Sequence, residues 1–154
     1  MSEQTTSDLC LAIVEHSSDA LIFADQQGVI RLWNPSAQAL FGFPAHEAIG
    51  QSLDLIIPER LRAAHWKGFD QAVEAGRTKY GRRAMITRAI HKSGAKLYVD
   101  MSFAITRDAA GQVIGTVAIA RDSTERHAAD TALRTRIAEL EVQLKVHSDK
   151  APRA

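Results

Sequence analysis

His65 is the side chain in this sequence with the clearest capacity for chemistry. It follows Leu61 by four residues and precedes Phe69 by four, a spacing that places all three on one face of an α-helix. An imidazole on an apolar helical face is buried, and a buried imidazole needs a partner. Neutral imidazole is a common ligand of iron. Two interpretations are therefore open: a core histidine bonded to a backbone carbonyl, or a metal ligand.

Other kinds of chemistry find little support. The sequence contains no glycine loop that could cradle a phosphate, no CxxC pair and no closely spaced His/carboxylate motif. It also contains no nucleophile–base pair that would indicate hydrolysis. We therefore predict a binding domain that is not an enzyme. The other histidines are scattered and expected to be solvated: His16, His46, His91, His127 and His147.

Composition and charge indicate one globular domain. The chain has 154 residues, of which 45% are apolar and 24% charged, and its net charge is +1. Lys and Arg form no dense block, so nucleic acid is not an expected partner. No apolar stretch is long enough to cross a membrane, and the polar N-terminus does not read as a signal peptide. Because the lone Cys10 fits a reducing compartment, we predict a cytoplasmic protein.

The elements that must position His65 follow from periodicity and turn signals. A helix is expected from Pro58 to about Ala75, and Asn34-Pro35 marks the start of a shorter one. Two extended segments, a group of helices and then three extended segments predict an α+β domain. Alternation and flanking turns place the strands at residues 20–24, 29–33, 84–91, 96–106 and 113–121.

The C-terminal region has a different pattern. Leu133, Ile137, Leu140 and Leu144 recur at spacings of four, three and four, which is an a/d stripe of about two heptads. A helix this short is marginal alone and needs a partner surface. We predict that a second copy covers the stripe and that the chain is a homodimer. Packing of this helix onto its own sheet is the alternative.

Several motifs, taken in order, resemble those of PAS domains, also called S-box domains. They are Asp19-Ala20-Leu21-Ile22, Trp33-Asn34-Pro35-Ser36-Ala37, Leu40-Phe41-Gly42-Phe43, Lys92-Ser93-Gly94 and Arg121-Asp122-Ser123-Thr124-Glu125-Arg126. The resemblance implies a five-stranded antiparallel sheet with helices on one face, enclosing a small-molecule pocket. We accordingly divide the chain into an N-terminal capping helix (1–17), a sensory domain (18–124), a coiled-coil-like C-terminal helix (125–148) and a disordered tail (149–154).

Within that family, the segment from Ile57 to His65 resembles the heme-binding oxygen sensors. Those sensors carry Pro-Glu, and a His seven residues after the Pro is the axial iron ligand; Pro58 and His65 keep this interval. The resemblance implies a b-type heme with His65 as its proximal ligand. Gly68 would leave room for the flat macrocycle. The other residues expected around it are Leu61, Phe69, Met101, Phe103, Val117 and Ile119.

One strand position departs from the oxygen sensors. Where they place an Arg that contacts bound oxygen, this chain has Met85. A thioether cannot donate that hydrogen bond, but its sulfur can coordinate iron. We therefore expect a weaker oxygen response and a six-coordinate state in which Met85 or Met101 is the sixth ligand; Met85 as a space-filling residue is the alternative. For the heme propionates, the basic residues expected are Lys79, Arg82 and Arg83.

The predicted function is a sensor of redox state or of a diatomic gas (O2, CO or NO) that signals to a separate output protein. Any peroxidase-like activity of the heme would be incidental. The alternative is a PAS dimerisation module without heme, either empty or holding another small ligand such as a flavin. Covalent flavin photochemistry is excluded, because there is no Cys in the helical region from Leu53 to Pro58.

Overall fold

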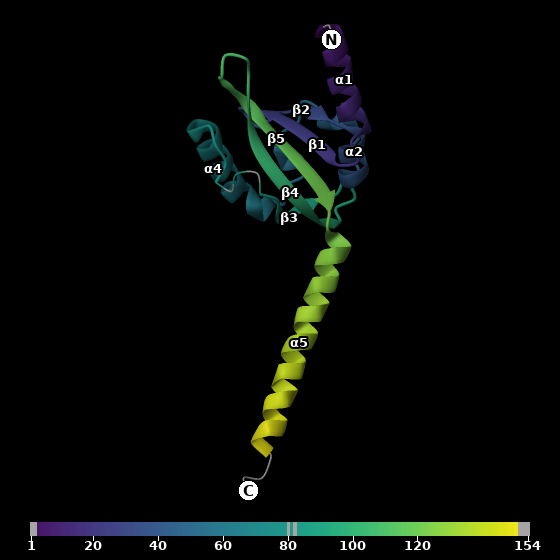
Figure 1. Ribbon diagram of the computed structural model, residues 1–154, viewed down its shortest axis with the longest axis vertical. Coiled ribbons are helices and arrows are strands. Elements are labelled where there is room, and N and C mark those ends of the chain that lie inside the picture. The colour runs from purple at the N-terminus through teal and green to yellow at the C-terminus, as the bar shows by residue number, and fades with distance from the viewer. Residues whose placement is uncertain (1–2, 80, 82, 151–154) are drawn as a thin grey trace. The chain divides into compact units, whose positions relative to one another are not determined.

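The computed structural model describes residues 3–79, 81 and 83–150, and it divides into one unit up to Asp122 and a second from Ser123. In the first unit (Figure 1) the elements are α1 (Glu3–His16), β1 (Ala20–Asp25), β2 (Ile30–Trp33), α2 (Pro35–Phe41), α3 (Ala45–Ala48), the 3-10 helix η1 (Leu53–Leu55), α4 (Glu59–Ala75), β3 (Met85–Ile90), β4 (Lys96–Arg107) and β5 (Val113–Asp122). The predicted order of strands and helices is confirmed.

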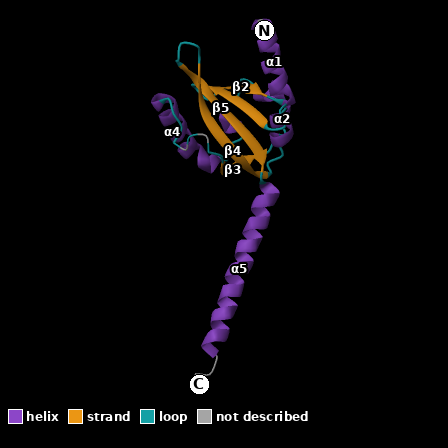
Figure 2. Ribbon diagram, viewed as in Figure 1, coloured by secondary structure: helices purple, strands orange, loops and turns teal. Residues whose placement is uncertain are grey.

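The five strands form one antiparallel sheet in the order β2-β1-β5-β4-β3. Strands β1 and β2 form one hairpin, while β3, β4 and β5 form a meander. The pairing of β1 with β5 joins these two parts, and the helices between β2 and β3 cover the sheet (Figure 2). The helical segment is therefore held at both ends by the sheet that it covers, as the α+β prediction requires.

Small side chains line the inward face of the central strands. Ala20, Ile22 and Ala24 of β1 are buried, and so are Ala118 and Ala120 of β5. Residues on alternate positions of a strand share a face, so these five side chains line one side of the sheet. Alanines fill little of the space between this face and the helices, and the fold therefore leaves room for a cavity.

Asn34 is the polar centre of the N-terminal half. It is the N-cap of α2 and is buried, with 1% of its surface exposed. Its Oδ1 accepts hydrogen bonds from the backbone N–H groups of Leu21 and Ala37, each at 2.9 Å. Its Nδ2 donates to the backbone oxygens of Val14 and Asp19, each at 3.0 Å. One side chain thus joins α1, β1 and α2.

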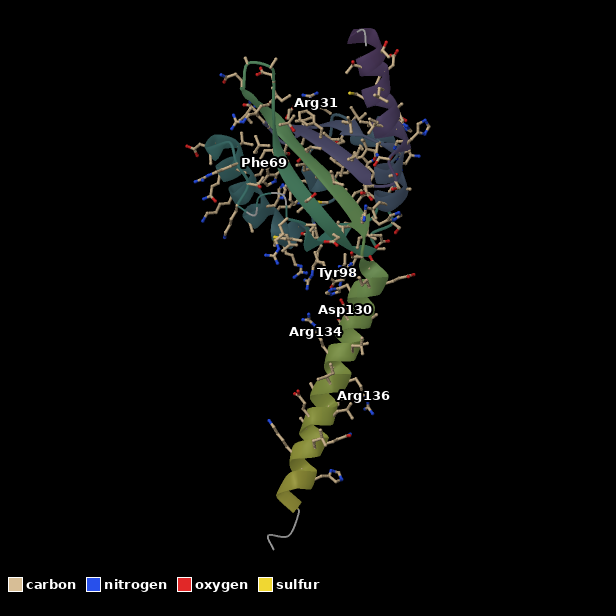
Figure 3. All side chains as sticks on the ribbon, in the orientation of Figure 1. Arg31, Phe69, Tyr98, Asp130, Arg134 and Arg136 are labelled. Atoms are coloured by element: carbon tan, nitrogen blue, oxygen red, sulfur yellow. The ribbon has the colours of Figure 1, made fainter. Side chains whose placement is uncertain are left out.

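The second unit is the helix α5 (Thr124–Lys150), and residues 151–154 of the expected tail lie outside the described residues. Its side chains, among them Asp130, Arg134 and Arg136 in Figure 3, extend outward along the helix. The predicted apolar stripe of Leu133, Ile137, Leu140 and Leu144 is exposed in the single chain.

Among the described residues, no helix has both the length and the apolar character needed to span a membrane.

Candidate ligand-binding site

A cavity of about 890 Å³ lies between α4 and the inward face of the sheet. This volume is within the range of roughly 300–1,000 Å³ that is usual for small-molecule sites. Its apolar lining comes from parts of the fold that are distant in the sequence: β1, η1 with the residues after it, α4, and the strands β3, β4 and β5. The main apolar residues are Ile22, Leu53, Ile56, Leu61, Phe69 and Met101.

Helix α4 brings His65 to this cavity. The helix begins after Pro58, and its last turn ends at Gly76 in the left-handed conformation, so both boundaries match the predicted signals. Phe69, labelled in Figure 3, extends from α4 toward the sheet and is part of the core. His65 lies one turn before it, with ring centroids 6.0 Å apart. The sequence therefore placed the imidazole on the correct face of the helix.

The Nε2 atom of His65 is buried and has no hydrogen-bond partner. A buried polar atom without a partner costs about 1–3 kcal/mol, which makes such atoms rare in folded proteins. A core histidine is usually held by hydrogen bonds at its buried ring nitrogens, and the buried Nε2 of His65 has none. The imidazole thus presents an unused nitrogen in the wall of an apolar cavity.

Burial lowers the pKa of His65 below its usual value, although the carboxylates of Asp54 and Asp70 act in the opposite direction. The ring is therefore neutral at pH 7. A neutral imidazole can offer a lone pair to a metal, whereas the protonated ring cannot. The electrostatic environment of His65 is consistent with ligation.

This lowered pKa predicts how the stability of the ligand-free domain depends on pH. Below about pH 6.5 the unfolded chain takes up a proton at His65 that the folded chain does not. The contribution of His65 to the free energy of unfolding is therefore complete above that pH. It is lost as the pH falls toward the pKa of His65 in the folded chain. In urea unfolding between pH 5 and 7.5, the free energy of unfolding should fall less on acidification in His65→Leu than in the wild type. The same loss in His65→Leu as in the exposed control His46→Leu would contradict the prediction.

Among the described residues, few side chains that could bind a metal lie around the cavity. In the part of the chain that the structure describes, no three His, Cys, Asp or Glu side chains gather into a group that could hold a bare ion. The cavity instead offers one imidazole and a large apolar surface. That combination fits a metal already held in an organic ring, because such a metal needs only axial ligands from the protein.

Most of the residues predicted for the site line the cavity. They are Leu61, His65, Gly68, Phe69, Lys79, Met101 and Phe103. The lining also includes residues that no sequence pattern indicated, chiefly Ala24, Ala89, Thr116 and Ala118 on the sheet, Lys67 in α4 and Arg77 just after it. Small residues gave no signal of their own, because they resemble ordinary core positions.

The expectation that Val117 and Ile119 complete the cavity wall is wrong. Across β4, Val117 pairs with Ala104 and Ile119 with Ser102, whereas the cavity residue Phe103 pairs with Ala118. Paired residues on adjacent strands lie on the same face, so Val117 and Ile119 are on the outer face. The inward positions of β5 belong to smaller residues, Thr116 and Ala118, and the larger apolar residues face outward.

The methionine and basic residues predicted for the site differ in whether they line the cavity. Met101 is 6% exposed and lines the cavity; its cross-strand partner Met85 is 39% exposed and is not among the lining residues. Arg83 is exposed and also outside the lining, which corrects its predicted role. Arg82 lies outside the described residues. The cationic residues of the described lining are Lys67 in the middle of α4, Arg77 and Lys79 just after its end, and Arg88 of β3.

The order of the elements, the sheet topology and the cavity can be compared with known families. The sequence pattern of the PAS fold matches residues 14–128, about three quarters of the chain. The chain belongs to the PAS fold family. This match spans every strand of the sheet and all the cavity-lining residues.

Two curated proteins are similar to this PAS domain over part of its length. The oxygen sensor protein DosP of Escherichia coli is 24% identical over 111 residues, which is 72% of this chain. The sensor protein FixL of Bradyrhizobium diazoefficiens is 39% identical over 54 residues, or 35% of this chain. The chain spans only 14% and 11% of the lengths of these two relatives. The predicted resemblance to oxygen-sensor PAS domains is thus confirmed at the level of the domain.

A solved structure of an RNA-binding light-oxygen-voltage receptor has the same fold. Its TM-score is 0.72 at 19% identity, and the match covers 90% of this chain and 39% of the receptor chain. At this identity the likeness shows the fold alone. The fold alone therefore does not identify a ligand, and the side chains in the cavity must do so.

Gly68 gives a prediction about the stability of the ligand-free domain. A Cβ added there would meet no atom within 4 Å, and the residue is inside α4 and lines the cavity. Gly68→Ala should stabilise the ligand-free domain by about 0.5–1 kcal/mol, because Ala is the better helix former. Urea unfolding measures this change. Destabilisation by Gly68→Ala would show that the helix requires Gly for a reason other than space.

Proposed function

We propose that this PAS domain binds b-type heme with His65 as the proximal iron ligand, and that it senses a diatomic gas or redox state. The observation that carries the proposal is the buried, unpartnered Nε2 of His65 in the wall of the cavity. Ligation by iron would give this atom the partner that it lacks. Bound heme would supply an iron centre that can exchange a gas ligand and change its oxidation state.

The remaining lining residues suit the other parts of such a ligand. The apolar side chains from η1, α4 and β4 would contact a flat hydrophobic ring. Arg77 and Lys79 follow the end of α4 and Lys67 lies in its middle, and among the described lining residues no Asp or Glu opposes them. Cationic side chains at the edge of an apolar cavity favour a ligand with carboxylates. Propionate groups meet that description.

Met101 is the candidate for the sixth iron ligand. It is buried in the sheet wall of the cavity, whereas the alternative, Met85, is more exposed and outside the lining. A thioether sulfur can coordinate iron but cannot donate a hydrogen bond to bound oxygen. We therefore propose that gas binding displaces Met101, and that the oxygen response is weaker than in sensors that use an Arg.

We further propose that the domain is cytoplasmic and that it signals to a separate protein.

We also propose that two copies of the chain form a homodimer through α5. The stripe of Leu133, Ile137, Leu140 and Leu144 leaves 41–70% of each side chain exposed in the single chain. Exposed leucines at coiled-coil spacing are stabilised when a second helix covers them. Sedimentation of Leu140→Lys against the wild type tests this: the wild type should be a dimer and the variant a monomer.

Titration of the ligand-free domain with hemin tests the heme proposal. We expect one hemin per chain, with a sharp Soret band that differs from that of free hemin. A domain that remains colourless with excess hemin would contradict the proposal. Binding of a flavin in place of hemin would support the alternative module.

A further inference from the structure

Trp66 joins the helix that carries His65 to two other elements. Its indole Nε1 donates a hydrogen bond to Oδ1 of Asp54 in η1, at 2.8 Å. The far edge of the indole lies over Gly28 in the β1–β2 turn, where an added Cβ would be 2.2 Å from Cη2 of Trp66. Only glycine leaves room for the ring at this place. The indole is therefore held at both of its ends.

The elements that hold Trp66 are themselves fixed to one another. The backbone N–H of Leu53 in η1 donates to the backbone oxygen of Gly28 at 3.0 Å. From α4, Nη2 of Arg62 donates to the backbone oxygen of Asp54 at 3.1 Å. The first turns of α4, the 3-10 helix and the β1–β2 turn thus form one connected block, with Trp66 at its centre.

The position of Trp66 determines the direction of its neighbour in the sequence. Consecutive residues of an α-helix point about 100° apart, so any rotation that moved the indole away from Asp54 would also turn His65 away from the cavity. The two rings are in edge-to-face contact, with centroids 5.1 Å apart and planes at 81°. Because Nε2 of His65 has no hydrogen-bond partner, no bond at that atom orients the imidazole.

We propose that Trp66 is the positioning residue for His65: its hydrogen bond to Asp54 and its contact with Gly28 fix the rotation of α4, so that the imidazole faces the ligand. This inference rests on the proposed role of His65 as a ligand. It assigns a function to Trp66 and Asp54, neither of which the cavity chemistry requires. It also explains why the binding helix is anchored to the β1–β2 turn.

Hemin binding by matched variants tests the proposal. Trp66→Phe keeps an aromatic ring beside His65 and Phe69 but loses the indole N–H, and Asp54→Ala removes its acceptor. Each should weaken hemin binding about 10-fold or more, as loss of a residue that orients a metal ligand does. The losses should be less than additive in the double variant, because both changes break the hydrogen bond between the indole and Asp54, although Asp54→Ala also removes the 3.7 Å ion pair with Arg62. Asp54→Asn keeps an acceptor oxygen and should restore most of the affinity.

Trp33→Phe is the control for a purely structural effect. Trp33 is buried, and its indole donates to the backbone oxygen of Phe43 at 2.9 Å, away from the cavity lining. This variant should lose stability toward urea while binding hemin as the wild type does once folded. If Trp66→Phe behaves in the same way, with unchanged hemin affinity and spectrum, Trp66 is a core residue only and the proposal is wrong.

A measurement on the ligand-free domain separates this inference from the heme proposal. Amide hydrogen exchange should rise in residues 59–69 and in residues 26–30 together in Trp66→Phe and Asp54→Ala, but not in Trp33→Phe. Unchanged exchange in residues 59–69 of Trp66→Phe would overturn the positioning role, whatever the ligand is. Failure of the wild type to bind hemin, with this coupled change present, would overturn the heme proposal and leave the positioning role supported.

Discussion

Replacing His65 with alanine is expected to weaken hemin binding by more than about 100-fold and to change the Soret band of any complex that remains. Residues that merely orient a metal ligand contribute roughly 10–100-fold to affinity, so removal of the ligand itself should exceed that range. The apolar cavity remains in His65→Ala, and any residual binding measures the hydrophobic contribution alone. Absorption titration of the purified variant gives both quantities.

Two controls make this result specific to His65. His46→Ala removes an imidazole whose side chain is 81% exposed, and it should bind hemin as the wild type does. In His65→Gly, added imidazole should restore the spectrum of the wild-type complex, because the free ring can occupy the space that the side chain leaves. Equal hemin affinity and an unchanged spectrum in His65→Ala would show that another residue is the ligand.

Replacing Asn34 with alanine should destabilise the domain by about 3–4 kcal/mol, a large effect for a residue outside the cavity. The change leaves the backbone N–H groups of Leu21 and Ala37 and the backbone oxygens of Val14 and Asp19 without their partner. Loss of the N-cap of α2 adds to this cost. Urea unfolding of the ligand-free domain measures the difference directly.

Gln38→Ala is the matched control for Asn34. Gln38 is in α2 and carries the same amide group, but it is exposed, and its side chain accepts a 3.3 Å hydrogen bond from the backbone N–H of Ala45. Its replacement should change the free energy of unfolding by less than about 0.5 kcal/mol. If the two variants lose similar stability, the buried network of Asn34 does not have the importance that its geometry indicates.

The order and boundaries of the main elements could be predicted from the sequence. Asn34-Pro35 marked the start of α2, Gly76 marked the end of α4, and the alternation in residues 96–106 identified β4. These signals are local, because capping, left-handed glycines and side-chain alternation depend on residues close in the chain. The inward direction of His65 followed from the same kind of reasoning, since helical periodicity fixes which residues share a face.

Positions that depend on contacts between distant segments could not be predicted in this way. The wall contributed by β5 was misassigned because the face of Ala118 is set by its pairing with Phe103 of β4. The contact of Trp66 with Gly28 joins residues 38 positions apart, and no local pattern marks it. The missing partner of His65 Nε2 is likewise a property of the assembled cavity. The sequence by itself thus determined the elements and the face of the key imidazole. The tertiary structure decided which side chains surround that imidazole, because strand register and helix packing are set by long-range contacts.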